Sequence, residues 1–230
     1  MWKYPQMIVA LTNVNATFGK KRYYSSISTG GSIPMDEIER VLRARLGIKD
    51  DTLVQRGLDV SYVRYISKGE YLARQDDVFP GVAFLIEGLM RFYYIDSSGR
   101  EHTDCFCEDS VYPITSVIDL DMPLSVNIQA LEDSSVVVIP TTLVRTLLEN
   151  NVDVIRTYNQ ILKTSLAQNW EDKRALHQFD ALARYEWFLC RYEGLIDRIP
   201  HIHVASFLGI SPVTLSRLRR KKKIEAGERN

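Results

Sequence analysis

Residues 201–223 read HIHVASFLGISPVTLSRLRRKKK, and this stretch decides how the C-terminal part of the chain folds. Gly209 suits the left-handed conformation that ends a helix. Ser211 is a favoured N-cap and Pro212 a favoured first helical residue, so a second helix begins soon after the first has ended. The stretch therefore predicts a helix-turn-helix, in which two short helices meet at a tight turn.

Apolar spacing gives each of these helices an inner face. Val204, Ala205 and Leu208 lie on one side of the first helix, and Leu215 and Leu218 lie on one side of the second. The outward side of the second helix is left with small, hydroxyl-bearing and cationic side chains. The residues expected to contact a partner there are Ser211, Val213, Thr214, Ser216, Arg217, Arg220 and Lys221.

The outward face suits the surface of double-stranded DNA. A helix N-terminus and Ser or Thr hydroxyls can hydrogen-bond phosphate oxygens. Arg217 lies within the first two turns, where an arginine can donate to both O6 and N7 of guanine. The cations from Arg219 to Lys223 add salt-dependent attraction to phosphates. We therefore expect this helix to bind DNA; an ordinary helical hairpin with a solvated basic tail is the alternative.

The distribution of charge agrees with this expectation. The chain has 230 residues, and its 29 basic and 29 acidic side chains cancel. Residues 201–230 nevertheless carry seven basic against two acidic side chains, whereas residues 35–200 carry 18 against 27. A basic end on an acidic body is typical of a nucleic-acid-binding segment joined to a second domain.

Two helices are predicted upstream of this stretch. Asn151–Phe179 contains neither Gly nor Pro over 29 residues, which predicts a long helix. Asp180–Ile199 predicts another helix, which Pro200 ends. The long helix could pack on the rest of the chain or form a coiled-coil seam with a second copy. Its apolar positions include Val152, Ile155, Tyr158, Ile161, Leu162, Leu166 and Trp170.

Between residues 60 and 140 the apolar pattern has a period of two. Short β-branched or aromatic runs recur at a spacing of roughly 8–12 residues and are separated by turn signals such as Asp96-Ser-Ser-Gly99. This pattern predicts an antiparallel barrel or sandwich. The runs are 60–66, 71–74, 82–86, 91–95 and 136–139.

Helical segments flank the predicted strands on both sides. Met35 opens an amphipathic segment with Ile38, Val41, Leu42 and Leu46 at helical spacing, and Thr141–Leu148 predicts a short helix. Residues 1–34 show neither helical nor strand periodicity, which predicts a disordered extension. A basic arm that contacts DNA is the alternative interpretation.

Several classes of protein are disfavoured by composition. No apolar run approaches the roughly 18–20 residues of a membrane helix. Three cysteines, Cys105, Cys107 and Cys190, form no disulfide framework and fit a reducing cytoplasm. Cys105 and Cys107 with His102 are too few for a closed zinc site, so we expect structural cysteines and no metal. No catalytic motif is present, and we expect neither an enzyme nor a cofactor.

The order of these segments resembles the Crp/Fnr family of bacterial transcription regulators over residues 60–223. The long helix stands in the place of the family's dimerisation helix, and residues 204–220 stand in the place of its DNA-reading motif. The segments that look like turns of its β-roll are Lys68-Gly-Glu-Tyr-Leu72, Phe84-Leu-Ile-Glu-Gly88 and Asp96-Ser-Ser-Gly-Arg-Glu101.

The resemblance implies an α+β fold with an N-terminal antiparallel, jelly-roll-like β-roll over residues 35–145. A dimerisation helix over 146–179 and a helix-turn-helix domain over 180–230 would follow. It also implies a homodimer that binds a palindromic operator, responds to an effector and contacts RNA polymerase. A β-roll that binds a small molecule, with a basic tail that contacts protein or a membrane, is the alternative function.

Two departures from the family pattern change this expectation. Members that bind cyclic AMP carry a Gly-Glu pair and, about ten residues later, an Arg-Ser pair, which correspond here to Pro113-Ile114 and Leu124-Ser125. These four residues would line the effector pocket, where the apolar side chains of Ile114 and Leu124 cannot compensate the charge of a buried phosphate. We therefore expect that the pocket binds no cyclic nucleotide. It should take either an apolar or aromatic effector or no effector at all. Many members also place Arg and Glu at the positions of Pro212 and Val213, so the DNA sequence read here should differ.

Overall fold

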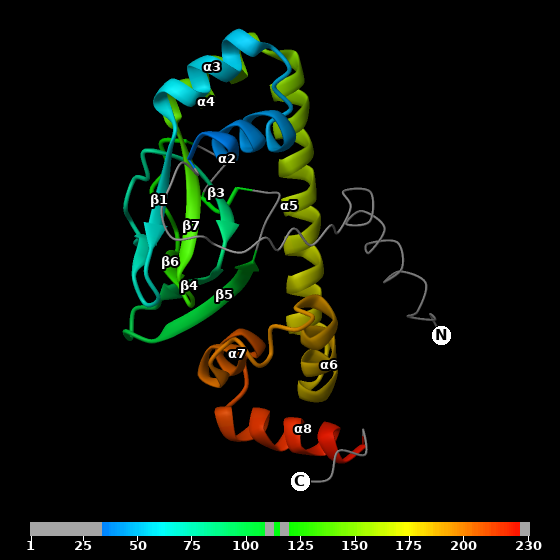
Figure 1. The fold of residues 1–230 in the computed structure, drawn as a ribbon. Helices are drawn as coiled ribbons and strands as arrows, with labels where there is room; N and C mark the ends of the chain where they lie inside the picture. The colour runs from blue at the N-terminus through cyan, green and yellow to red at the C-terminus, as the bar shows by residue number, and fades with distance from the viewer. Residues whose placement is uncertain (1–33, 109–112, 116–119, 226–230) are drawn as a thin grey trace, which may run out of the picture. The chain divides into compact units, whose positions relative to one another are not determined.

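The computed structural model describes residues 34–108, 113–115 and 120–225, all of them within the unit Ile33–Asn230 (Figure 1). The extension predicted over residues 1–34 lies outside the described residues, apart from Pro34. Helices α2 (Pro34–Arg40), η1 (Val41–Arg45) and α3 (Asp51–Val60) come first. The apolar residues of the predicted amphipathic segment, Ile38, Val41, Leu42 and Leu46, are all buried.

The first predicted strand begins later than its sequence suggests. Val60 is the last residue of α3, and the strand β1 runs over Tyr62–Ile66. Helix α3 forms because the Asp50 side chain caps it, accepting a hydrogen bond of 3.0 Å from the backbone N–H of Leu53. The sequence reading missed this cap and assigned Val60 to the strand.

Seven strands form two antiparallel sheets. The first sheet has the order β1-β7-β3, with β7 at Ser134–Pro140 and β3 at Gly81–Glu87. The second has the order β2-β6-β4-β5, and its strands are Tyr71–Ala73, Asn127–Ala130, Leu89–Ile95 and Glu101–Glu108. The predicted antiparallel arrangement is confirmed. Strands β5 and β6 were not among the predicted runs, because β5 is rich in polar residues and β6 has four residues.

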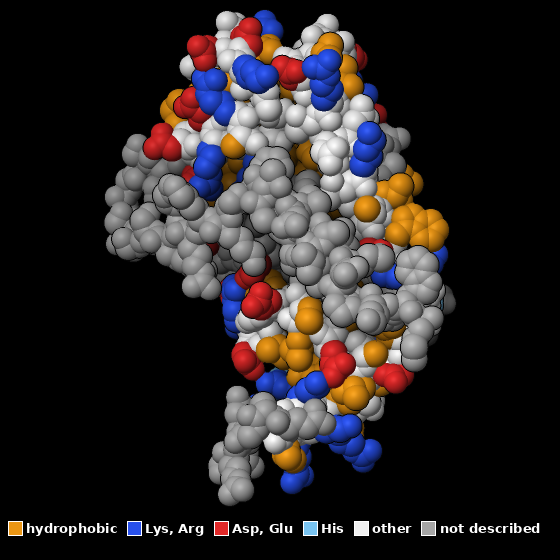
Figure 2. Space-filling view, turned by 90° about the vertical axis from the view of Figure 1, so that its right-hand side faces the viewer, with side chains coloured by type: hydrophobic (Ala, Val, Ile, Leu, Met, Phe, Trp, Pro, Cys, Tyr) orange, Lys and Arg blue, Asp and Glu red, His pale blue; other side chains and the backbone are white. Residues whose placement is uncertain are grey.

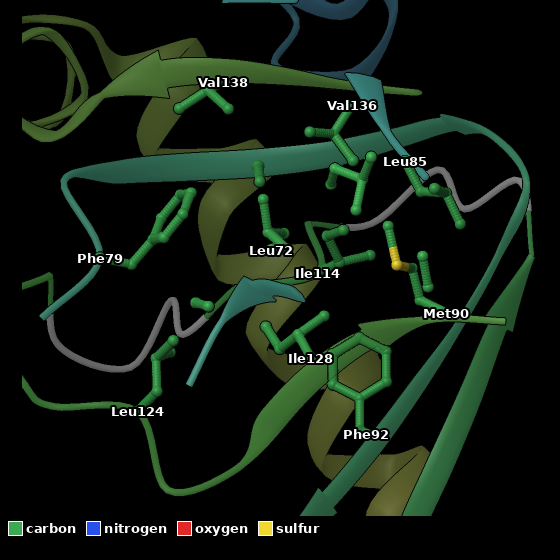
Figure 3. Close-up of a cluster of buried hydrophobic side chains, with 14 residues drawn as sticks. Leu72, Phe79, Leu85, Met90, Phe92, Ile114, Leu124, Ile128, Val136 and Val138 are labelled. Atoms are coloured by element: carbon green, nitrogen blue, oxygen red, sulfur yellow. The ribbon is translucent and has the colours of Figure 1, made fainter. Parts of the chain in front are cut away.

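The two sheets enclose an apolar core (Figure 3). The turn between β3 and β4 requires Gly88, whose φ is +109°. A Cβ atom at this position would lie 2.1 Å from the Oγ of Ser134, so only glycine allows β7 to pass this closely. The turn therefore joins one sheet to the other without opening the core.

Helices make up the rest of the chain. Helix α4 spans Thr141–Asn150 and α5 spans Val152–Gln178, in agreement with the two helices predicted there. Asn151 caps α5, accepting a 3.0 Å hydrogen bond from the N–H of Val154. They are followed by α6 (Ala181–Arg191), α7 (His201–Leu208) and α8 (Pro212–Glu225).

The helix predicted over Asp180–Ile199 was too long. Helix α6 ends at Arg191, and the chain then follows turns up to Ile199. Gly194 adopts a φ of +79° in these turns, a conformation outside the right-handed helix. Pro200 does not end that helix; it precedes α7, where its fixed φ suits a helix start.

Candidate functional site

The turn between α7 and α8 has the geometry that its residues predict. Gly209 is left-handed, with φ 62° and ψ 38°, and the N–H of Ile210 donates to the carbonyl of Ala205 at 3.0 Å. The Ser211 Oγ then accepts from the N–H of Thr214 at 3.1 Å, as an N-cap does. These local hydrogen bonds end one helix and begin the next within three residues.

The inner faces of the two helices are buried as predicted. Val204, Ala205, Leu208 and Leu215 are buried in a cluster with side chains of α6, and Leu218 packs against the same cluster. Because these residues face inward, the opposite side of α8 is left at the surface. Apolar contacts among α6, α7 and α8 therefore hold the helix pair together.

The outer face of α8 presents most of the predicted contact residues to solvent. Ser211, Ser216, Arg217, Arg220 and Lys221 are exposed. The apolar side chain of Val213 is 61% exposed. Thr214 is only half-buried, and its Oγ1 lies 2.9 Å from the Oγ of Ser211. The hydroxyls of Ser211 and Thr214 are therefore engaged with each other at the start of the helix.

The basic cluster at residues 219–223 divides into two groups. Arg219 is 17% exposed at its side chain and donates from Nη2 to Oδ1 of Asp197 at 2.9 Å. Lys222 forms an ion pair with Glu186. Lys221 and Lys223 are exposed, and Figure 2 shows Lys and Arg side chains gathered at the lower end of the view, where α8 lies in Figure 1. Asp197 and Glu186 therefore hold Arg219 and Lys222 by ion pairs, while Lys221 and Lys223 lie at the surface.

Helix α7 packs directly on the edge strand β5 of the second sheet. The backbone N–H of Thr103 donates to the Oγ of Ser206 at 3.0 Å. The Phe106 ring meets those of Tyr192 and Phe188 edge-on, with centroids 5.6 Å and 6.3 Å apart. The strands therefore contribute to the same core as the helix-turn-helix, an arrangement that the sequence did not predict.

Arg198, in the turns before α7, adds ion pairs with acidic residues of the strand region. Its guanidinium donates to both carboxylate oxygens of Glu132, at 2.9 Å and 2.6 Å, and also pairs with Glu108. The hydrogen bond from Arg198 lowers the pKa of Glu132. A bidentate arginine contact fixes orientation as well as distance, so it holds the turns before α7 against the roll.

His203 lies at this junction and not in open solvent. It is half-buried on α7, whereas His201 is exposed. Burial, together with the positive charge of Arg91, lowers the pKa of His203 to about 4, although Glu101 opposes this change. Arg91 is itself 2% exposed and donates to Thr103 and Glu101 at 3.0 Å and 2.8 Å. The imidazole is therefore neutral at pH 7.

The residues predicted to form the effector pocket occupy two different environments. Ile114 and Leu124 are 5% and 4% exposed, and in Figure 3 both lie among the side chains of the roll core, with Leu72 and Phe79 near them. Pro113 is half-buried opposite Phe84, and Ser125 is exposed. The apolar side chains of Ile114 and Leu124 thus fill space between the sheets.

A surface cavity of about 350 Å³ lies at the edge of this core and has Phe79 in its lining. It is bordered by residues before β3 and by the start of α4, and Arg145 pairs with Asp121 at 2.8 Å on its lining. It does not include the predicted pocket residues Pro113, Ile114, Leu124 and Ser125.

The cysteines and His102 do not converge. Cys105 and Cys107 are half-buried and pack against the roll core, and burial raises the pKa of the Cys105 thiol. The His102 ring stacks on Tyr94 and its Nε2 lies 2.7 Å from Oδ2 of Asp96. Within the described ranges, no three His, Cys, Asp or Glu side chains are grouped to hold a metal ion. None of the described helices is long and apolar enough to cross a membrane.

Comparison with known proteins gives one family-model match and several structural ones. Residues 63–151 match the family model described as a cyclic nucleotide-binding domain. FixK2 from Bradyrhizobium japonicum has a TM-score of 0.60 at 17% identity, covering 73% of this chain and 86% of its own. A Crp/Fnr-family protein from Eubacterium rectale has a TM-score of 0.62 at 18% identity, covering 76% and 84%.

A third structure is CLP of Xanthomonas campestris, a global regulator that responds to c-di-GMP. Its TM-score is 0.61 at 13% identity, and the match covers 77% of this chain and 93% of CLP. No curated protein matches the chain at a significant level. The resemblance noted in the sequence is confirmed at the level of the fold: this chain combines antiparallel sheets and C-terminal helices in the way that Crp/Fnr regulators do.

Proposed function

We propose that this protein is a transcription regulator of the Crp/Fnr type that binds a palindromic DNA operator as a homodimer. The observation that carries the proposal is the outer face of α8, where Arg217, Arg220, Lys221 and Lys223 are exposed beyond a capped N-terminus. A recognition helix needs this combination, because its first turns contact base edges while cations contact phosphates. The proposal includes a cytoplasmic location and contact with RNA polymerase.

The two apolar faces of α5 support the homodimer. Val154, Ile161 and Ala175 are buried against the rest of the chain. On another face, Leu166 and Trp170 are 60% and 64% exposed. Figure 2, which views the molecule from the side of α5, shows hydrophobic side chains at its surface. A second apolar face on a helix that already packs inward indicates a second partner, and the symmetry of a palindromic operator makes that partner another copy.

The spacing on this face is that of a coiled coil. Ile155, Asn159, Leu162 and Leu166 recur at steps of four, three and four residues, which brings them to one side of the helix. Asn159 is exposed within this seam. An asparagine in a coiled-coil seam favours two parallel strands in one register, because it pairs with the same residue of the other copy. Two recognition helices would then reach half-sites about one turn of DNA apart.

The packed apolar core between the two sheets supports a regulator that does not respond to cyclic nucleotides. Ile114 and Leu124 supply neither a hydrogen-bond acceptor for a ribose hydroxyl nor a charge for a phosphate. Both side chains already contact the core, so a nucleotide would have to displace them as well as leave its phosphate unpaired. We propose that any effector is apolar or aromatic, or that DNA binding needs none.

The test is selection of bound sequences from a pool of random duplexes, followed by affinity measurements at several salt concentrations. We expect a palindrome with half-sites about one helical turn apart, and an affinity that falls steeply as salt rises. Vesicles of anionic phospholipid form the second arm. Binding to vesicles without selection of any duplex would overturn the proposal in favour of a membrane-contacting tail.

A further inference from the structure

We infer that Val213 selects a thymine in the operator by contacting its C5 methyl group, next to a guanine contacted by Arg217. The inference rests on the proposed function, since it specifies what the α8 face binds. It begins with the side chains that can extend into a groove. Val213, Ser216, Arg217 and Arg220 are exposed and recur at steps of three, one and three residues, so they share one side of α8.

Several neighbouring side chains on α8 make contacts within the protein. Ser211 and Thr214 hydrogen-bond each other at the cap, and Leu215 is fully buried. Arg219 and Lys222 pair with acidic residues of the same C-terminal helices and turns. Val213 lies in the first turn of α8 beside these residues, and its side chain is 61% exposed.

An exposed valine at this position discriminates among bases by its chemistry. It has no hydrogen-bond donor or acceptor, so it cannot pair with the polar groups that every base presents in the major groove. The C5 methyl of thymine is the apolar group of the major groove, and contact with it removes apolar surface of both partners from water. The same side chain thus favours thymine and disfavours the alternatives.

The distance along the helix fixes where this thymine lies. Val213 and Arg217 are four residues apart, which corresponds to about 6 Å along the helix axis. Successive base pairs are separated by about 3.4 Å. The thymine should therefore lie within about two base pairs of the guanine that Arg217 contacts.

The experiment uses the full chain and the operator obtained by selection. Each thymine of one half-site is replaced in turn by deoxyuridine, which pairs identically but lacks the C5 methyl. We expect one position to lose about fourfold in affinity, the equivalent of one buried methyl-sized group. That position should lie within about two base pairs of the one at which Arg217→Ala relaxes base preference.

The substitution Val213→Ala then shows whether this side chain is responsible. We expect the variant to bind the thymine and uridine operators equally. Ile224→Ala is the matched control, because Ile224 is an exposed apolar residue at the other end of α8 and its loss should keep the fourfold difference. The inference is overturned if no thymine shows the effect or if Val213→Ala retains it. Failure to select any duplex would instead overturn the proposed function, before any uridine is introduced.

Discussion

Arg217 and Arg219 are two residues apart on α8, yet they meet different surroundings. A separation of two residues places side chains on nearly opposite sides of a helix. Arg219 consequently lies against the turns before α7 and pairs with Asp197, whereas Arg217 is exposed beside Val213 and Ser216. Arg219 is therefore held by an internal ion pair, and of these two arginines Arg217 is the one that we propose contacts a base.

Substitution of Arg217 should change which sequences bind. Arg217→Ala is expected to lose about 1–3 kcal/mol at one base position and to relax the preference there, because a bidentate contact to guanine is removed. Competition binding against operators altered at each position measures this loss. An equal loss on every duplex would show that Arg217 contacts phosphate only.

The exposed side chains of Lys221 and Lys223 should contribute to affinity and not to sequence preference. Lys221→Ala combined with Lys223→Ala is expected to weaken all duplexes alike and to reduce the slope of affinity against salt, because each phosphate contact releases counterions. Lys49→Ala is the matched control, since this exposed lysine precedes α3, outside the helix-turn-helix. Salt titrations of binding test the difference, and a sequence-dependent loss in the double variant would contradict it.

The roll should not bind cyclic AMP or cyclic GMP. The loss of a charged partner to a buried phosphate costs about 2–5 kcal/mol, and Ile114 and Leu124 together lack both the carboxylate and the guanidinium. Calorimetric titration should therefore detect no binding. A dissociation constant of tens of micromolar or tighter would show that the side chains between the sheets rearrange to admit a nucleotide.

At the scale of elements, α5 has one buried face and, on another side, the seam of Ile155, Asn159, Leu162 and Leu166. Leu166→Glu places a charge in that seam, where it would face its counterpart in the other copy. We expect this variant to be a monomer at micromolar concentration and the unaltered chain to be a dimer, because a charge removed from water without a partner is costly. Light scattering with and without DNA measures the change.

The matched control for this substitution is Gln160→Glu. Gln160 is exposed on the same helix but lies about 120° around it from Leu166. We expect this variant to remain dimeric. If both variants dissociated, charge on α5 rather than the seam would be responsible, and a dimer that survived Leu166→Glu would refute the assignment of the seam.

The contact of Arg198 with Glu132 should make stability depend on pH. Because this contact lowers the pKa of Glu132 in the folded protein, its stabilisation is present above the unfolded value of about 4.3 and disappears as pH falls through the folded value. Arg198→Ala should therefore reduce the free energy of unfolding by about 1 kcal/mol at pH 7, since both side chains are partly exposed, and by less at pH 3. Urea unfolding at the two pH values tests this. An equal loss at both would assign the effect to packing of the arginine stem.

For the whole molecule, the strands and the C-terminal helices are joined by shared burial. Leu89, Phe106 and Leu131 of the sheet region belong to the same apolar cluster as Tyr185, Phe188 and Leu215. Cooperativity of unfolding follows from such shared cores, because neither part can unfold without exposing the other. We expect one thermal transition for the unaltered chain.

Removal of the Phe106 ring should separate the two parts. Phe106→Ala is expected to cost about 3–5 kcal/mol and to split the calorimetric transition into two, because the lost ring contacts Phe188, Tyr192 and Phe207. Phe79→Ala removes an equally large ring from the core between the sheets. This control should lower the transition temperature and keep a single transition. A single transition in Phe106→Ala would mean that other contacts suffice to couple the parts.

The sequence by itself determined the features that depend on neighbours a few residues away. The left-handed Gly209, the cap at Ser211 and the bounds of α5 follow from local hydrogen bonds and from the periodicity of one segment. The roles expected for the α8 side chains and for the dimer remain predictions. Errors arose where local signals were misread, as at Val60 and in the turns after Arg191.

Only the tertiary structure decided which side chains remain available at the surface. Arg219 and Lys222 stand in a run of five cations, and the fold pairs them with Asp197 and Glu186, which other segments bring close. Similarly, Phe106 lies in a polar strand and is buried by helices that begin some 75 residues later, and Ile114 is buried by strands of both sheets. Ion pairing and burial depend on segments distant along the chain, so no local pattern contains them.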